Sequence, residues 1–127
     1  MSRFVFDTSA ILAIIFEEPG ADRALASIHN ALITTVNITE ALTRCLDKQL
    51  SIEAVETFLA AHAMEFVDFG HNLARAAAAS RISTKPFGLS LGVRACLALA
   101  VREGATVMTA DRTWANLDIG CKIEVIR

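Results

Sequence analysis

The stretch from Arg3 to Leu12 places an apolar strand directly before an apolar helix. Residues Phe4–Phe6 are a short run of strand-forming residues, and Asp7 ends that run. Ser9 can cap a helix that opens at Ala10. Because the strand and the helix are both apolar, the strand is expected to be buried on both faces, as in a parallel α/β sheet.

Asp7 allows two interpretations at this point. A carboxylate at the carboxyl end of such a strand lies on the sheet edge where α/β proteins build their sites. Alternatively, Asp7 only helps to cap the following helix beside Ser9. The stretch by itself does not separate these two interpretations.

The composition indicates one apolar domain spanning residues 1–127. Hydrophobic residues make up 54% of the chain without counting glycine, whereas typical domains reach about 45–50% with glycine included. The longest apolar runs, residues 10–16 and 95–101, are far shorter than the ~18 residues of a membrane span. Met1 and Ser2 lead directly into a strand, so we expect no signal peptide and no membrane insertion. The excess apolar surface is expected in the core or against a partner.

The cysteines, histidines and net charge exclude several other classes of site. Cys45, Cys96 and Cys121 form no C-x-x-C pair, which favours a reducing cytoplasm over a disulfide framework or a zinc site. The three histidines show no ligand spacing. A net charge of −2 gives no support to general nucleic-acid binding, although local basic patches remain compatible with it.

The rest of the chain alternates between strand and helix patterns. We expect strands at residues 4–6, 32–34, 65–69, 106–109 and 123–126. We expect helices at residues 9–16, 21–29, 36–50, 51–63, 72–80, 90–103 and 112–117, with a polar loop at 81–88. Such alternation predicts a mostly parallel five-stranded sheet with right-handed crossovers.

Two further acidic residues lie at positions that suit either a site or a cap. Glu40 ends the tetrad Asn37-Ile38-Thr39-Glu40, which also fits a capping box with Asn37 as the cap. Asp111 closely follows the strand at 106–109, so it can share a sheet edge with Asp7. The alternative role of Asp111 is to cap the short helix that contains Trp114.

Val93 is unusual for its position. Ser90 fits the N-cap of the helix at 90–103, which makes Val93 its third helical residue. The start of a helix favours an acidic residue there, for capping and for the helix dipole. A β-branched apolar side chain is therefore unexpected.

The chain resembles the PIN-domain ribonucleases, specifically the VapC-type toxins of toxin–antitoxin pairs. Four segments carry the resemblance: Phe6-Asp7-Thr8-Ser9-Ala10, Asn37-Ile38-Thr39-Glu40-Ala41, residues 89–100, and Thr109-Ala110-Asp111-Arg112-Thr113-Trp114. Each segment is short, but their order and spacing together are fairly specific. The resemblance implies a three-layer α/β/α PIN-like fold around the mostly parallel five-stranded sheet.

The resemblance also implies a catalytic cluster. Similar proteins carry acids that match Asp7, Glu40 and Asp111, and an aspartate directly after the glycine that matches Gly92. Here that last position is Val93, which implies weak or absent activity without disturbing the fold. Clustered carboxylates repel one another unless a cation neutralises them, and Mg²⁺ and Mn²⁺ prefer such hard oxygen ligands. A bound metal ion generates hydroxide that can attack a phosphodiester in RNA.

Several neighbouring side chains are candidates for supporting contacts. Thr8, Ser9 and Thr109 can donate hydrogen bonds to metal-bound water or to phosphate. Arg94 and Arg112 flank the acidic positions and can bind phosphate. Surface ion pairing is the alternative for both arginines.

The resemblance further implies a homodimer, an antitoxin whose C-terminal segment lies over the acidic site, and cleavage of single-stranded or loop RNA. The candidate residues for a hydrophobic antitoxin groove are Ile14, Ile15, Phe16, Leu46 and Leu50, which could instead all belong to the core. A non-catalytic PIN module that binds antitoxin or RNA is the main alternative. A phosphatase or phosphoacceptor on a similar sheet is disfavoured, because Asp7-Thr8-Ser9 is not the D-x-D sequence that such a site would favour.

Overall fold

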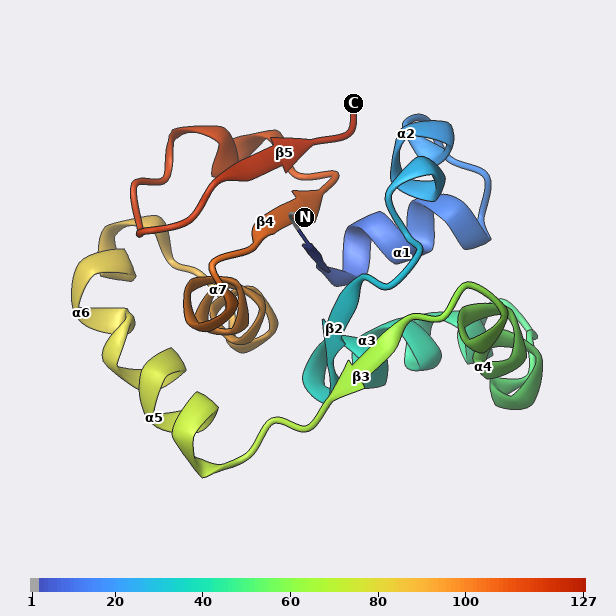
Figure 1. The fold of residues 1–127 in the computed structure, drawn as a ribbon, viewed down its shortest axis with the longest axis horizontal. Coiled ribbons are helices and arrows are strands. Elements are labelled where there is room, and N and C mark those ends of the chain that lie inside the picture. Colours follow the sequence, from blue (N-terminus) through green and yellow to red (C-terminus); the bar gives the residue numbers. More distant parts are fainter. Residues whose placement is uncertain (1–2) are drawn as a thin grey trace.

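The computed structural model describes residues 3–127, which form a five-stranded sheet with helices on both faces (Figure 1). The strands are β1 (Phe4–Phe6), β2 (Leu32–Thr34), β3 (Glu65–Val67), β4 (Thr106–Thr109) and β5 (Ile123–Val125). The helices are α1 (Thr8–Ile15), α2 (Ala21–Ala26), α3 (Thr35–Asp47), α4 (Ile52–Ala61), α5 (His71–Ala79), α6 (Arg81–Thr84) and α7 (Leu91–Glu103). Two 3₁₀ turns complete the elements, η1 (Lys85–Phe87) and η2 (Arg112–Asn116).

The five described strands are all parallel and lie in the order β3-β2-β1-β4-β5. This confirms the predicted sheet, which is fully rather than mostly parallel. The first strand occupies the centre, and its Val5 and Phe6 are completely buried on opposite faces because side chains alternate along a strand. The carboxyl ends of β1 and β4 are therefore neighbours.

Two apolar cores separate the structure into three layers. One core packs Phe6 and Met108 of the sheet against α1 to α4, and the other packs Val5 and Val107 against α5 and α7. Figure 1 shows the two groups of helices on opposite sides of the sheet. The α/β/α layering expected from the resemblance is thereby confirmed.

Two predicted helix caps are wrong. Helix α1 starts at Thr8 because Asp7, not Ser9, is its N-cap, and the Asp7 carboxylate accepts a hydrogen bond from the amide of Ala10 at 2.9 Å. Helix α3 is capped by Thr34, whose hydroxyl oxygen accepts from the Asn37 amide at 3.1 Å. Asn37 is consequently inside the helix and free to make long-range contacts with its side chain.

The segment from Arg81 to Gly88 is also not the expected loop, because most of it forms α6 and η1. Thr84 is buried there, and both its amide and its hydroxyl donate hydrogen bonds to the carbonyl of Ser80. The two predicted boundaries of α7 are confirmed. Ser90 caps its first turn, and Gly104 ends it with a left-handed backbone at φ 62°.

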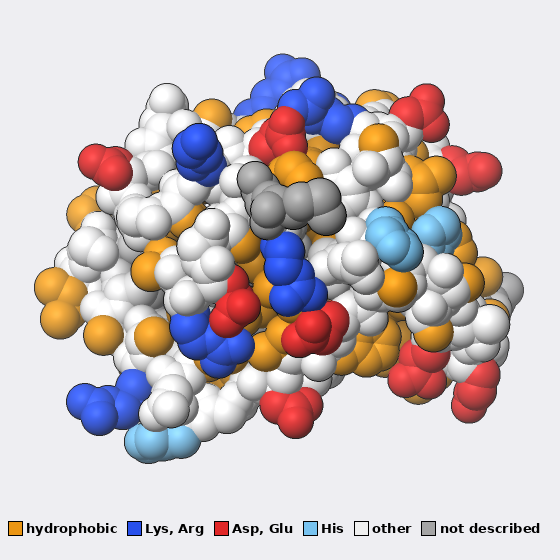
Figure 2. All heavy atoms as spheres, viewed as in Figure 1, with side chains coloured by type: hydrophobic (Ala, Val, Ile, Leu, Met, Phe, Trp, Pro, Cys, Tyr) orange, Lys and Arg blue, Asp and Glu red, His pale blue; other side chains and the backbone are white. Residues whose placement is uncertain are grey.

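Within residues 3–127, no single helix is long and apolar enough to cross a membrane. The helical segments 71–87 and 91–103 meet that length and hydropathy only when taken together, and a bend of 119° separates them. The prediction about Met1 and Ser2 leading directly into a strand lies outside the described residues. The face seen in Figure 2 carries interspersed acidic and basic side chains with apolar atoms between them.

Candidate active site

A cavity of about 540 Å³ opens at the carboxyl ends of β1 and β4. The first turns of α1 and α7, one face of α3, and the start of η2 surround it. Its lining residues are Asp7, Thr8, Ser9, Leu12, Asn37, Thr39, Glu40, Thr43, Arg44, Ser90, Gly92, Val93, Asp111 and Trp114. The structure thus brings the four positions of the expected acidic cluster to one cavity.

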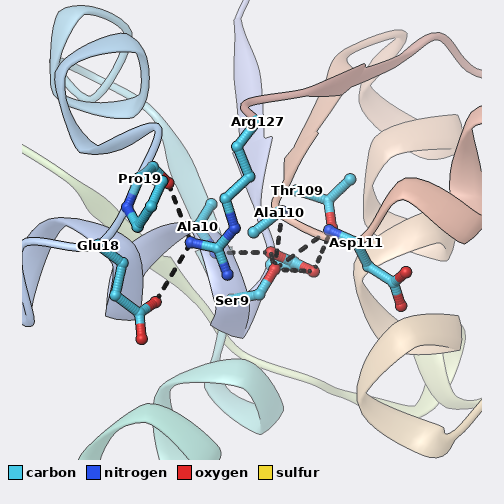
Figure 3. Close-up of polar contacts among 9 residues, drawn as sticks. Ser9, Ala10, Glu18, Pro19, Thr109, Ala110, Asp111 and Arg127 are labelled. Atoms are coloured by element: carbon cyan, nitrogen blue, oxygen red, sulfur yellow. Dashed lines mark hydrogen bonds and ion pairs between the residues drawn. The ribbon is translucent and has the colours of Figure 1, made fainter.

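Asp7 is the most constrained of the three acids. Its side chain is buried at 5% exposure and accepts hydrogen bonds from the hydroxyls of Ser9 (2.7 and 2.9 Å) and Thr109 (2.7 Å). Figure 3 shows Ser9 and Thr109 converging at the end of the strand. Burial raises the pKa of the Asp7 carboxyl, and the negative charge of Asp111 adds to that rise, while the hydrogen bonds from Ser9, Thr109 and Ala10 oppose it.

Glu40 is held in the cavity by one contact from α1 and one from its own helix, α3. The hydroxyl of Thr8 donates to its Oε1 at 2.6 Å, and the side-chain amide of Asn37 donates to the same oxygen at 3.4 Å. A Cβ atom placed on Gly92 would lie 2.3 Å from that oxygen. The carboxylate of Glu40 therefore occupies the space that any side chain larger than glycine would need at position 92.

Asn37 connects α3 to α7, a role that its interpretation as a helix cap missed. It is 1% exposed, and its Nδ2 donates to the carbonyl of Gly92 at 3.0 Å. Its Oδ1 accepts from the hydroxyl of Thr34 at 2.7 Å. One sequence feature could have predicted this role: Asn37 lies beside Ile38 on the buried side of a helix, where an amide side chain needs hydrogen-bond partners.

Asp111 both caps η2 and lines the cavity. Its Oδ1 accepts from the amide of Thr113 at 2.9 Å and from the hydroxyl of that residue at 2.7 Å. In Figure 3 the Asp111 carboxylate points away from the hydrogen-bond network around Ser9 and Thr109. The capping role and the position beside the site therefore coexist in one exposed side chain.

Val93 is half-buried, and it contributes an apolar wall to the cavity while packing against the core formed with α5 and α7.

Arg94 and Arg112 do not line the cavity. The guanidinium of Arg94 donates to the carbonyls of Leu89 (3.3 Å) and Ala77 (3.0 Å). Arg112 donates to the backbone carbonyl of Arg127 at 2.8 Å. Both arginines thus hold backbone segments together in this structure.

The donor chemistry of the cavity fits a hard divalent cation. Asp7, Glu40 and Asp111 offer carboxylate oxygens, which Mg²⁺ and Mn²⁺ prefer. Within residues 3–127, no three His, Cys, Asp or Glu side chains are close enough as they stand to hold one ion. The helix cap and two hydroxyls fix Asp7 in place, whereas Glu40 and Asp111 are exposed side chains, each held by the hydrogen bonds described above.

A second, more apolar groove of about 380 Å³ lies between α1, α2 and α4. Of the five residues predicted for a hydrophobic groove, Ile14, Ile15 and Leu50 line it. Phe16 packs against the core instead, and Leu46 is exposed outside the groove. Leu25 of α2 and Phe58 of α4 also belong to the apolar lining.

Comparison with known proteins gives one family and a set of similar solved structures. A toxin–antitoxin complex from Klebsiella pneumoniae aligns at TM-score 0.76 and 20% identity, covering 97% of each chain. DNA-bound VapBC from Salmonella typhimurium aligns at TM-score 0.75 and 20% identity over 100% of each chain. VapBC-5 from Mycobacterium tuberculosis aligns at TM-score 0.60 and 23% identity, over 100% of this chain and 99% of that one.

These low identities establish a shared fold, and the curated proteins give no match. The family described as PIN domain matches residues 4–120, which is most of the chain and includes every acidic residue of the cavity. The chain therefore belongs to the PIN-domain family.

Proposed function

We propose that this protein is an Mg²⁺- or Mn²⁺-dependent endoribonuclease toxin of a VapBC-type pair, with its activity weakened by valine at position 93. PIN domains are generally nucleases and typically use divalent metal ions. The observation that carries the proposal is the placement of Asp7, Glu40 and Asp111 around one cavity at the carboxyl edge of a parallel sheet. Single-stranded or loop RNA is the proposed substrate.

Asp7, Glu40 and Asp111 would hold the metal ion, which supplies an activated water for attack on the phosphodiester and stabilises charge on the leaving oxygen. Ser9 and Thr109 fix the Asp7 carboxylate, and Thr8 orients Glu40 through its 2.6 Å hydrogen bond. Val93 offers no oxygen ligand, so the cavity has one carboxylate fewer than the expected pattern. The proposed consequence is weaker metal binding and slower cleavage.

The direct test is cleavage of labelled RNA by the parent chain and by Val93→Asp, each with Mg²⁺, with Mn²⁺ and with EDTA. The proposal expects weak or absent cleavage by the parent and clear metal-dependent cleavage by Val93→Asp. The double variant carrying Val93→Asp and Glu40→Gln is the matched inactive control. Absence of cleavage by Val93→Asp under all conditions would favour a non-catalytic PIN module, the alternative that the missing carboxylate at position 93 supports.

We further propose that an antitoxin covers the apolar groove between α1, α2 and α4 and extends a basic side chain into the acidic cavity. The fold shared with the Klebsiella and Salmonella complexes supports this partner. The apolar lining of the groove and the three carboxylates of the cavity supply complementary chemistry for such a segment. A partner of this kind and unpaired cysteines at positions 45, 96 and 121 suit a reducing cytoplasm.

The groove proposal can be tested with two leucines that lie four positions apart in the sequence. Leu50 lines the groove, whereas Leu46 is exposed on α3 outside it. Leu50→Glu should abolish co-purification with a cognate antitoxin, and Leu46→Glu should leave it intact. Equal retention of the antitoxin by both variants would contradict this location.

We also propose that the chain forms a homodimer. Ile82, Phe87 and Leu91 are exposed at 88%, 56% and 51%, and they lie close together in sequence at α6, η1 and the start of α7. Apolar side chains exposed to this extent favour burial against another surface. Sedimentation of the parent chain should give a dimer, and Ile82→Lys should shift it toward monomer. A parent chain that sediments as a monomer at every concentration would refute the dimer.

A further inference from the structure

The acidic cavity has one cationic side chain on its wall. Among the described residues that line it, Arg44 is the only lysine or arginine. The two arginines predicted to bind phosphate, Arg94 and Arg112, instead donate to backbone carbonyls away from the lining. Any anionic substrate that enters this cavity therefore meets Arg44 as its one positively charged contact.

Arg44 also has donors that are not already used. It is exposed, and it takes part in none of the four ion pairs and none of the side-chain hydrogen bonds found within residues 3–127. Glu40 lies one turn earlier on the same face of α3, and the two charged groups do not form an ion pair within 4.0 Å. The guanidinium keeps five N–H donors for a ligand.

The hydroxyl groups around Arg44 cannot replace it as donors. Thr39 donates to the carbonyl of Thr35 at 2.8 Å, and Thr43 donates to the carbonyl of Thr39 at 2.7 Å. On the other side of the cavity, Thr8 and Ser9 donate to the carboxylates of Glu40 and Asp7. These four hydroxyl protons are committed to acceptors within the protein, which leaves Arg44 as the charged donor of the wall, with the hydroxyl of Ser90, an acceptor from the Val93 amide, at the start of α7.

We propose that Arg44 binds a backbone phosphate of the RNA strand and holds that strand against the acidic cavity. This inference rests on the proposed ribonuclease function, and it assigns a substrate contact on α3. Three carboxylates repel a polyanion, and a guanidinium at the rim of the same cavity offsets that repulsion with a planar pair of donors that matches phosphate oxygens.

The test is the binding of a fluorescein-labelled single-stranded RNA to the full chain, followed by anisotropy with Ca²⁺ present and over a range of salt concentrations. Arg44→Gln removes the charge, Arg44→Lys retains it, and Arg75→Gln is the matched control. Arg75 is an exposed arginine of a helix, α5, and it does not line the cavity. Thermal melts of all four proteins establish that they are equally folded.

Arg44→Gln should weaken RNA binding about tenfold and reduce the salt slope by about 0.7, which is the value for one lost phosphate contact on a single strand. Arg44→Lys should retain the slope with an intermediate affinity, and Arg75→Gln should match the parent. If the parent binds RNA and Arg44→Gln binds it with the same affinity and slope, the role of Arg44 is refuted while the RNA proposal stands. Equal losses of RNA affinity in Arg44→Gln and Arg75→Gln would also refute the role of Arg44. If neither the parent nor any variant binds the RNA, the ribonuclease proposal itself is overturned.

Discussion

The side-chain amide of Asn37 donates a hydrogen bond to the backbone carbonyl of Gly92 at 3.0 Å, joining the first turn of α3 to the first turn of α7. The contact is buried, since Asn37 is only 1% exposed. Glu40 and Val93 lie on the two helices that it joins. This hydrogen bond, between residues 55 positions apart, therefore helps to hold these two parts of the cavity together.

Replacing Asn37 should destabilise the fold. Asn37→Ala leaves the hydroxyl proton of Thr34 without its acceptor in a buried place, which costs about 1–3 kcal/mol, and it also removes the side-chain hydrogen bond to the Gly92 carbonyl. Asn72→Ala, at an exposed position of α5, should change the free energy of unfolding by less than about 0.5 kcal/mol. Urea unfolding of both variants measures the difference, and equal stabilities would show that the Asn37 contact is energetically unimportant.

Gly92→Ala should impair metal binding more than folding. The new Cβ would lie 2.3 Å from Glu40 Oε1, and that oxygen is the far end of a flexible side chain that can swing out of the cavity. In the Val93→Asp background, we expect the affinity for Mn²⁺ to fall by roughly tenfold or more, as for other changes that displace a ligand. The melting temperature of the metal-free protein should change little, because alanine is a better helix former than glycine.

Gly70→Ala is the control for this variant, because a Cβ at that position meets nothing within 4 Å. It should leave the Mn²⁺ affinity, measured by calorimetric titration, unchanged. An unchanged affinity in Gly92→Ala as well would mean that Glu40 is not a ligand or that its present position is not needed for binding.

The pH dependence of stability should report the buried carboxyl of Asp7. Its pKa in the folded state is raised above the ordinary value of 3.8, chiefly by burial. The folded protein therefore holds this proton more tightly than the unfolded chain, so the stabilising contribution is complete below pH 3.8 and is lost as the pH rises through the folded-state pKa. The Asp7→Asn side chain does not titrate, so the variant lacks this loss of stability. The free energy of unfolding of Asp7→Asn minus that of the parent should therefore increase as the pH rises above 3.8.

The measurement is urea unfolding of parent and Asp7→Asn in EDTA across the acidic range. A difference between Asp7→Asn and the parent that stays constant with pH would contradict a raised pKa.

Val93→Asp should have opposite effects on stability without and with metal. Without metal, a fourth carboxylate joins Asp7, Glu40 and Asp111 at the cavity, and like-charge repulsion should lower the melting temperature. With Mn²⁺, the same carboxylate becomes a ligand, and binding to the folded state should raise it again. Val101→Asp is the control on the same helix, since Val101 is 48% exposed and does not line this cavity. Loss of stability in Val93→Asp that Mn²⁺ does not reverse would remove position 93 from the metal site.

The order of elements and the parallel sheet could be predicted because both follow from local patterns. The apolar runs at Phe4–Phe6 and Thr106–Thr109, each followed by an aspartate and a helical turn, are visible in the sequence. The neighbouring positions of β1 and β4 place those aspartates at one edge, and this pairing joins residues about a hundred positions apart. The strand order itself depends on such long-range pairing and has no local signal.

Side-chain partners were less predictable than elements. Ser9 and Asn37 both have the chemistry of a cap, but Asp7 and Thr34 take those roles. The hydroxyl of Ser9 accepts from the Ala110 amide instead, and Asn37 donates to the Gly92 carbonyl. Arg94 flanks the acidic positions in sequence, yet its guanidinium reaches the carbonyl of Ala77 on α5. Each of these hydrogen bonds depends on which elements pack side by side. The helical periodicity of a sequence does not specify those neighbours.

The most direct test of the account is the anomalous scattering of Mn²⁺ in crystals of the parent chain and of Val93→Asp. The account predicts a manganese peak in the cavity of Val93→Asp, coordinated by Asp7 together with Glu40, Asp111 and the new aspartate, and a weaker peak at the same place in the parent. A cavity without manganese in Val93→Asp, or a peak that none of these carboxylates touches, would contradict the assignment of this cavity as a metal-dependent nuclease site.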